Sequence, residues 1–298
     1  MRLLFAPPLL CLLPLSAAAL GPTVGLLVDH TPMTCGASGS LETVLCNLEV
    51  YEATIAQAAA ASATAKVDLL ILPEAYGLSA GVKKAGHWEP LYLTNTTATT
   101  TACAEADNAT MPVQKAISCL ARKYGVAIAY NLFAQRGGAN RITEIVVDAA
   151  GGLRATYDKV HLFPVTEKAG GATPGTNAPV TFNLLGRKWG IIICYEGLYP
   201  YVPGGNFKQM DALYADNATT WIWSIGSDIP ISTIAKKLVV KYSGVFVAAT
   251  QDHSIMGKGV ITCGSSGAGC AYVDVTLDAA KLPDGYTGKP FLRTAVLP

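Results

Sequence analysis

Charged residues are scarce in this chain, which has 298 residues and only 14% Asp, Glu, Lys and Arg. The formal net charge is +1 and both signs are interspersed, so no basic stripe is present that would bind nucleic acid. Histidine is rare as well, and neither His161 nor His253 has the spacing of a metal-ligand pair. We therefore expect no nucleic-acid partner and no bound metal, and we expect both histidines to have packing or solvent roles.

Long apolar runs are missing after the first twenty residues, although 51% of the chain is hydrophobic and the mean hydropathy is +0.34. Arg2, the apolar stretch from Leu3 to Leu15 and the small residues at 17–19 together predict a signal peptide over residues 1–19. Three prolines interrupt the stretch and it is short for a bilayer, which argues against a membrane anchor. We expect a secreted or lumenal protein with a large buried core and no transmembrane segment.

The cysteine count agrees with an oxidising compartment. Cleavage after Ala19 removes Cys11 and leaves seven of the eight cysteines, so that six can pair and one thiol remains. Cys194 is the natural odd one, because its setting at the end of a buried strand, before a turn, differs from that of the others. We expect the other six to form disulfides between neighbours in the sequence: Cys35–Cys46, Cys103–Cys119 and Cys263–Cys270. Three Asn-X-Thr sequons predict glycosylation, at Asn95, Asn108 and Asn217.

Strand and helix patterns alternate along the chain, and two hairpins are mixed in. Period-3.6 patterns predict helices over 41–61, 112–124, 207–214 and 231–242. Apolar, β-branched runs predict strands over 23–28, 67–72, 126–130, 142–147, 153–157, 182–185, 189–193, 221–225, 245–250 and 259–262. Residues 77–111 are polar and rich in threonine, which predicts a long irregular loop. No internal repeat or linker divides residues 20–298, so we expect a single domain with two layers, each a mixed sheet covered by helices.

Three strand ends carry complementary chemistry. Cys194 closes a β-branched run and is followed by a turn, Glu74 follows the strand over 67–72, and Lys159 follows the strand over 153–157. Cys194 is the candidate nucleophile and Glu74 the general base and acid. Lys159 and the backbone N–H of Tyr195 are candidates to stabilise an oxyanion. Taken singly, each has a plainer interpretation: a core or disulfide cysteine, a solvated turn glutamate, a surface lysine. Together they predict a cysteine hydrolase.

The order Glu74, Lys159, Cys194 resembles the Glu-Lys-Cys triad of the nitrilase, or carbon–nitrogen hydrolase, superfamily. The motifs that carry this resemblance are Leu72-Pro-Glu74, Tyr157-Asp-Lys159-Val-His-Leu-Phe163 and Ile193-Cys194. A closer similarity is to its secreted vanin (pantetheinase) and biotinidase branch, through Pro73-Glu74 followed by Tyr76-Gly77 and through the helix around Pro112-Val-Gln-Lys-Ala-Ile-Ser-Cys-Leu120. The similarity covers roughly residues 23 to 275.

This resemblance implies an α-β-β-α sandwich and hydrolysis of a linear amide through a Cys194 thioester, with no cofactor. A pantetheine-type amide is the favoured substrate. A biotinyl amide, an aliphatic amide or a nitrile remains open, as does an inactive secreted binding glycoprotein. Glu167 matches a further glutamate of the superfamily that supports the lysine, but it is also consistent with a surface loop acid.

Two features depart from the vanin branch. Tyr195-Glu196 stands where that branch usually has Phe-Asp, and a further β-rich C-terminal region typical of the branch is absent or truncated in the 298 residues. The resemblance leaves the oligomeric state open between monomer and homodimer.

The disulfide pattern is testable by peptide mapping under non-reducing conditions. Each predicted pair is close in sequence, so that closing the loop costs little chain entropy, and we expect three linked peptides that join the pairs named above. Some of these thiols staying reduced would revise the pairing. A peptide that links Cys194 to any of the six would contradict both the pairing and the role of Cys194 as nucleophile.

Overall fold

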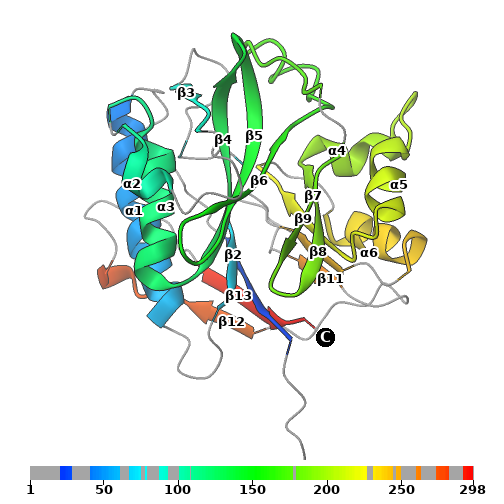
Figure 1. The fold of residues 1–298 in the computed structure, drawn as a ribbon. Helices are drawn as coiled ribbons and strands as arrows, with labels where there is room; N and C mark the ends of the chain where they lie inside the picture. The colour runs from blue at the N-terminus through cyan, green and yellow to red at the C-terminus, as the bar shows by residue number, and fades with distance from the viewer. Residues whose placement is uncertain are drawn as a thin grey trace, which may run out of the picture.

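The computed structural model describes residues 21–28, 41–60, 67–74, 78, 87–92, 101–107, 109–176, 179–226, 231–243, 246–249, 260–262, 273–281 and 291–297. Two sheets pack face to face, and helices cover the outer face of each (Figure 1). The predicted α-β-β-α architecture is therefore confirmed. The predicted signal peptide, Asn95, Asn108, Cys35, Cys263, Cys270 and His253 lie outside the described residues.

The helices agree with the predicted segments and add two short ones. Their bounds are α1 Leu41–Ala60, α2 Ala102–Glu105, α3 Pro112–Tyr124, α4 Tyr195–Leu198, α5 Lys208–Ala215 and α6 Ile231–Lys241. α3 begins at Pro112 and ends before Gly125, which adopts a left-handed φ of 64° that glycine tolerates. None of the described helices combines the length and the apolar character that a membrane span needs.

The first sheet has the strand order β12-β13-β1-β2-β4-β5-β6, with β3 paired to β4. Its strands are β1 Thr23–Val28, β2 Leu69–Ile71, β3 Glu89–Pro90, β4 Ala127–Arg136, β5 Ala139–Val147, β6 Leu153–Asp158, β12 Val273–Thr276 and β13 Phe291–Val296. The second sheet has the order β11-β10-β9-β8-β7. Its strands are β7 Thr181–Leu184, β8 Arg187–Ile193, β9 Thr220–Ser224, β10 Phe246–Ala249 and β11 Val260–Thr262.

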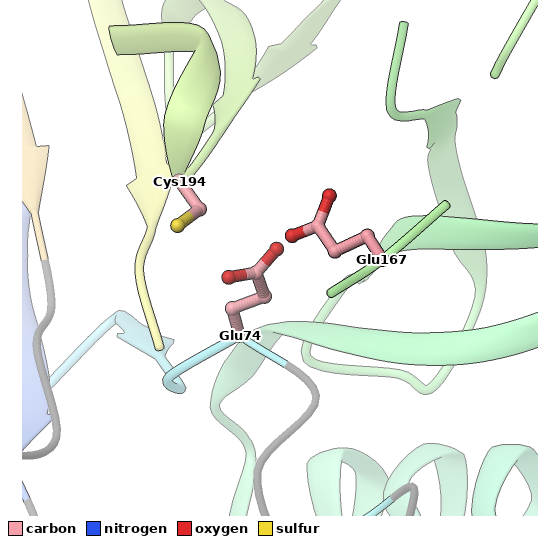
Figure 2. A group of neighbouring side chains, drawn as sticks. All are labelled: Glu74, Glu167 and Cys194. Atoms are coloured by element: carbon pink, nitrogen blue, oxygen red, sulfur yellow. The ribbon is translucent and has the colours of Figure 1, made fainter. Parts of the chain in front are cut away.

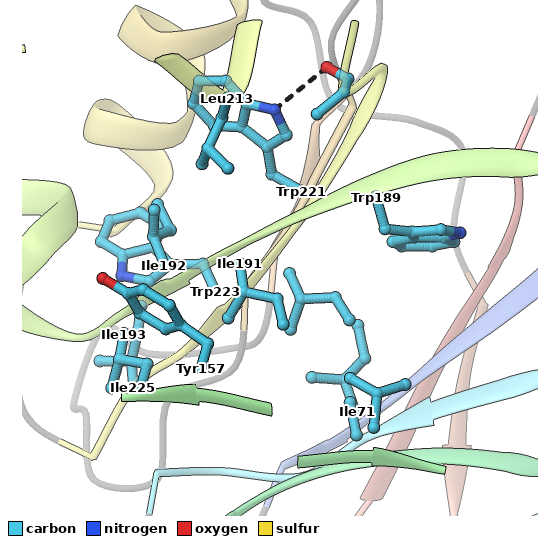
Figure 3. Packing of buried hydrophobic residues seen from close by; sticks show 14 of the residues in the cluster. Ile71, Tyr157, Trp189, Ile191, Ile192, Ile193, Leu213, Trp221, Trp223 and Ile225 are labelled. Atoms are coloured by element: carbon cyan, nitrogen blue, oxygen red, sulfur yellow. Dashed lines mark hydrogen bonds between the residues drawn. The ribbon is translucent and has the colours of Figure 1, made fainter. Parts of the chain in front are cut away.

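Alternation along the strands builds two cores. Leu69 and Ile71 of β2 face the second sheet, whereas Leu70 and Leu72 pack against α1 and α3. Trp221 and Trp223 of β9 are completely buried in the core on the two faces of the second sheet (Figure 3). The sandwich therefore has an apolar interior in which any charged side chain must find a partner.

Some strand predictions were incomplete. The strand predicted over 126–130 continues to Arg136 and turns back into β5 through Gly137 and Gly138, both at positive φ. Buried Asn131 interrupts the apolar run, which concealed this extension. β12 and β13 were not predicted, and the loop predicted over 77–111 contains β3 and α2.

The cysteines in the described part of the chain support the predicted pairing in part. Cys103 and Cys119 are joined by a disulfide that links α2 to α3, as predicted. Cys46 is disulfide-bonded as well, and its pairing with Cys35 stays a prediction. Cys194 carries a thiol rather than a disulfide. Asn217 is exposed, so its sequon is accessible, and its glycosylation stays a prediction.

The first turn of α3 is capped by Glu89, a residue of β3 that lies outside the helix. Met111, the residue before the helix, makes no side-chain capping bond. Instead, the completely buried Glu89 carboxylate accepts hydrogen bonds from the backbone N–H of Val113 at 2.7 Å and from that of Gln114 at 3.3 Å. This carboxylate satisfies amides that the helix itself leaves unpaired.

Glu89→Ala is therefore expected to destabilise the fold, because it leaves buried donors without acceptors. The expected loss in free energy of unfolding is about 1–3 kcal/mol, measured by urea denaturation. Glu105→Ala is the matched control, since the Glu105 side chain is exposed and accepts from the Tyr92 hydroxyl. An equal loss in the two variants would contradict the capping role of Glu89.

Candidate active site

Cys194 lies on a strained elbow between β8 and α4. Its φ of 40° and ψ of −107° fall in a region that residues other than glycine rarely adopt. Three hydrogen bonds hold this backbone: Cys194 N–H donates to the Ser224 carbonyl at 2.7 Å, and its own carbonyl accepts from the Trp223 indole at 2.9 Å and from Gly197 N–H at 3.1 Å. The sulfur is thereby presented at a fixed position beyond the end of β8.

The turn after Cys194 needs a glycine for space. A Cβ atom placed on Gly197 would lie 2.1 Å from the Trp223 ring, far inside van der Waals contact. The indole that binds the Cys194 carbonyl thus also packs closely against Gly197 of α4. This explains the glycine three residues after the cysteine, which the sequence showed only as part of a turn.

Two strand ends of the first sheet supply the charged groups. β2 runs parallel to β4, and β5 is antiparallel to β4 and to β6, so β2 and β6 end at the same edge of the sheet. Glu74 follows β2 and Lys159 follows β6. Strand direction therefore brings these two residues together, although 85 positions separate them in sequence.

A buried ammonium lies between two carboxylates. Lys159 Nζ is 2.6 Å from Glu74 Oε1 and 2.5 Å from Glu167 Oε1, and the lysine is completely buried. The other oxygen of Glu167 accepts from Phe163 N–H at 2.7 Å, which fixes the loop after Lys159. Glu167 is thus buried beside the lysine, and the surface-loop interpretation of it was wrong.

The sulfur adjoins this charged group. A carboxylate oxygen of Glu74, one of Glu167 and the Cys194 sulfur all lie within 4.8 Å of one another. Figure 2 shows the Glu74 carboxylate between the sulfur and Glu167. These are the only such potential metal ligands grouped in the described part of the chain, and both carboxylates already form ion pairs with Lys159.

The electrostatics favour a permanent cation. Burial lowers the pKa of Lys159, but the negative charges of Glu74, Cys194 and Glu167 outweigh it and hold that pKa above its ordinary value. Burial also raises the pKa of Glu167, against the opposing effect of Lys159. Lys159 therefore remains an ammonium at neutral pH.

Glu196 links the segment after β6, which carries Lys159, to the end of β8, which precedes Cys194. The sequence did not reveal this role. One of its oxygens accepts from the N–H of Val160 at 2.8 Å and from the Tyr157 hydroxyl at 2.6 Å. The other accepts from Ile193 N–H at 2.8 Å. Val160 follows Lys159 and Ile193 precedes Cys194, so a single buried carboxylate sets the spacing of both. The signal available in the sequence was an acid two residues after the candidate nucleophile.

The remaining predicted residues, Tyr195 and His161, are partly buried close to Cys194 and Lys159 in the sequence. Tyr195 is the first residue of α4, so its N–H is one of the donors that the helix leaves unpaired near Cys194. Its ring meets Phe163 edge-on at 5.5 Å. His161 stacks on Tyr199 at 3.8 Å and its Nδ1 lies 3.2 Å from Gln209 Oε1, in agreement with a packing role.

Lys159→Met tests the ion cluster independently of any activity. Removing the cation leaves two buried carboxylates without their partner, for which the expected loss of stability is about 3–5 kcal/mol. Because Lys159 lowers the pKa of Glu167, that pKa rises further in the variant and the folded state retains a proton. The loss should therefore be larger at about pH 8 than at about pH 5.

Urea unfolding of Lys159→Met and of Lys188→Met at both pH values makes the comparison. Lys188 pairs with the exposed Asp216 in water, so its replacement should cost far less stability than that of Lys159. Equal costs for the two variants would show that the buried cluster does not contribute as described.

Comparison with known proteins agrees with this geometry. Residues 36–220 match the family model described as carbon–nitrogen hydrolase. No curated protein sequence matches the chain. Among solved structures, the chain is similar to an amidase from Nesterenkonia sp., with a TM-score of 0.62, 18% identity and coverage of 94% of this chain and 91% of that one.

Two further structures of the Nesterenkonia amidase resemble the chain in fold. One is a glutamate-to-glutamine mutant with the acetamide moiety of fluoroacetamide added covalently at the active-site cysteine (TM-score 0.62, 18% identity, coverage 94% and 92%). The other is a cysteine-to-alanine mutant in complex with butyramide (TM-score 0.62, 16% identity, coverage 94% and 92%). With the family model matching well over half of its residues, this chain belongs to the carbon–nitrogen hydrolase family of the nitrilase superfamily.

Proposed function

We propose that the protein hydrolyses a linear amide through a thioester on Cys194. The observation that carries this proposal is the convergence of a thiol on a strained elbow, a carboxylate and a buried ammonium. A thiol alone attacks amides poorly, because attack needs a thiolate, a stabilised oxyanion and a protonated leaving amine. The three groups at this site supply these requirements.

In the acylation half, Glu74 takes the proton of the Cys194 thiol and the sulfur attacks the carbonyl carbon. The Lys159 ammonium and the N–H of Tyr195 hold the oxygen that becomes negative. Collapse of the tetrahedral intermediate breaks the C–N bond, and Glu74 returns its proton to the departing amine. In the second half, Glu74 takes a proton from water, the hydroxide attacks the thioester, and the acid leaves as the Cys194 thiol is regenerated.

The favoured substrate is an amide of the pantetheine type, cleaved to pantothenate and cysteamine. The similarity to the vanin branch at Pro73-Glu74 and along α3 supports it, and the Cys103–Cys119 disulfide agrees with a secreted protein. Secretion itself is proposed from the predicted signal peptide, the paired cysteines and the sequons.

A simple aliphatic amide is the second candidate. It is favoured by the fold similarity to an amidase whose mutant was crystallised with butyramide. Incubating the purified protein with pantetheine, a biotinyl amide, butyramide and butyronitrile, and measuring released amine or ammonia, separates the candidates. Release of cysteamine with the highest kcat/KM supports the proposal. The absence of amine from every amide would favour a binding protein that has kept the fold.

Substitutions at the site test the mechanism. We expect Cys194→Ala to abolish amine release, since no other group can form the acyl enzyme. Glu74→Gln should lower kcat by about 10²–10⁴-fold, because proton transfer to and from the reacting atoms is lost. Both rates are measured on the preferred amide, with circular dichroism to verify the fold. Glu52→Gln, an exposed acid that pairs with Lys123, is the control and should retain full activity.

Turnover at the wild-type level in Cys194→Ala would contradict the covalent mechanism. An unchanged kcat in Glu74→Gln would assign the base to another residue.

A further inference from the structure

A further glutamate is buried beneath the site, and the mechanism above does not use it. Glu144 lies in the middle of β5, opposite Asn131 of β4 and Tyr157 of β6. None of its surface is exposed to solvent. The strand around it is otherwise apolar from Ile142 to Val147 apart from Thr143, so a carboxyl group here requires an explanation.

The Glu144 carboxyl group bridges the two sheets through neutral partners. Its Oε1 accepts from the Ser224 hydroxyl at 2.8 Å, and its Oε2 accepts from the Asn131 amide at 3.2 Å. Ser224 is the last residue of β9, which belongs to the opposite sheet. The contact thus fixes the end of β9 against β5 in the otherwise apolar interior.

The segment that Glu144 holds, residues 224–226, forms hydrogen bonds with the backbone of both Cys194 and Glu74. The Ser224 carbonyl accepts from Cys194 N–H at 2.7 Å, and the Ile225 carbonyl accepts from Glu74 N–H at 3.4 Å. Gly226 follows, and a Cβ atom placed there would lie 3.3 Å from a carboxylate oxygen of Glu74. A shift of residues 224–226 would therefore move the sulfur and the general base together.

The charge state of Glu144 follows from its surroundings. Burial and, to a smaller extent, the negative charge of Glu74 raise its pKa to about 8, against the lowering effect of the bonds from Ser224 and Asn131. At neutral pH the group is therefore mainly a carboxylic acid. Such an acid has one O–H donor and retained acceptor capacity, which suits the polar neutral groups around it.

We propose that Glu144 is a positioning residue that acts as a neutral acid: it anchors Ser224, and thereby Cys194, without placing a second negative charge beside Glu74. The proposal rests on the amide-hydrolase function proposed above. It deepens that function by identifying the residue whose ionisation ends activity at alkaline pH.

The effect of ionisation follows from the groups that face Glu144. Tyr130 of β4 packs on the opposite face of this sheet, beside α1 and α3, and its pKa is raised by burial, by Glu89 and by Glu144. β6 contributes Tyr157, which is also buried. Glu74 is the ionised neighbour that acts on Glu144. A negative charge on Glu144 would oppose the charge on Glu74 and on the oxyanion of the tetrahedral intermediate, so kcat should fall as Glu144 loses its proton.

The kinetic test is the pH profile of kcat on the preferred amide. Wild-type protein should lose kcat above about pH 8. Glu144→Gln should keep kcat at pH 7 to within about threefold, because a carboxamide offers the same donor and acceptor as the neutral acid, and it should lack the fall at that pH. Glu144→Ala should lose more than tenfold at pH 7, on the order expected when reacting groups are misplaced.

Ser224→Ala provides an independent variant. It removes the hydrogen bond that lowers the pKa of Glu144, so the alkaline fall in kcat should move to higher pH. Glu52→Gln, which changes an exposed acid, should leave the fall where it is in the wild type.

Thermal unfolding tests the neutral acid without any substrate. The folded-state pKa of Glu144 is above its unfolded value of 4.5, so wild-type stability is full below that value and falls as the pH rises to about 8. Glu144→Gln lacks this dependence, and the Tm of the wild type relative to this variant should decline over that range.

Three results would overturn the proposal: an alkaline fall in Glu144→Gln at the wild-type pH, an equal loss of kcat at pH 7 in Glu144→Gln and Glu144→Ala, or a Tm difference that does not change with pH. If the wild type releases no amine from any amide, the proposed function fails, and the unfolding comparison still decides whether Glu144 is neutral.

Discussion

The buried ammonium of Lys159, held between Glu74 and Glu167, is the interaction on which the site depends. A completely buried lysine is costly unless anionic partners repay its lost hydration. Two carboxylates and the adjacent sulfur do so, and they raise the lysine pKa despite its burial. The same cluster that stabilises the cation inside the protein gives it a fixed place beside Cys194, where an oxyanion would form.

The arrangement of the two sheets brings the members of this cluster together. Glu74 and Lys159 come from strand ends of one sheet and Cys194 from a strand end of the other, so the cluster lies where the two sheets meet (Figures 1 and 2). Glu196 then fixes the distance between the strand ends that carry Lys159 and Cys194. Its buried carboxylate accepts from the backbone N–H of Val160, after Lys159, and of Ile193, before Cys194. The apolar core holds the sheets together, and the buried polar groups determine how their ends align.

The sequence was sufficient for the parts of the site that depend on local pattern. Cys194, Glu74 and Lys159 each follow a strand that was predicted from the sequence, and the resemblance to a Glu-Lys-Cys triad implied that the three residues meet. The burial of Glu167 could not, because it is set by a loop whose path depends on the lysine it contacts. Ser224 and Glu144 face each other across two sheets, and no local signal gives the register of one sheet on the other.

The same reasoning explains the errors in the fold. β1, α3 and the β5–β6 hairpin have strong local patterns and were predicted closely. β13 pairs with β1 from the other end of the chain, and its short mixed run contains Arg293, which binds Asp274 of β12. Such a strand is stabilised by partners that are distant in sequence, so its own residues do not identify it.

The most direct test of this account is to observe the acyl enzyme. An activated ester of the preferred acyl group acylates rapidly, so that release of the acyl group limits turnover and the intermediate accumulates. Acid quenching followed by intact-mass measurement and peptide mapping should show one acyl group per chain, on the peptide that contains Cys194. Steady release of acid with no adduct on Cys194, or an adduct on another residue, would contradict covalent hydrolysis at this site.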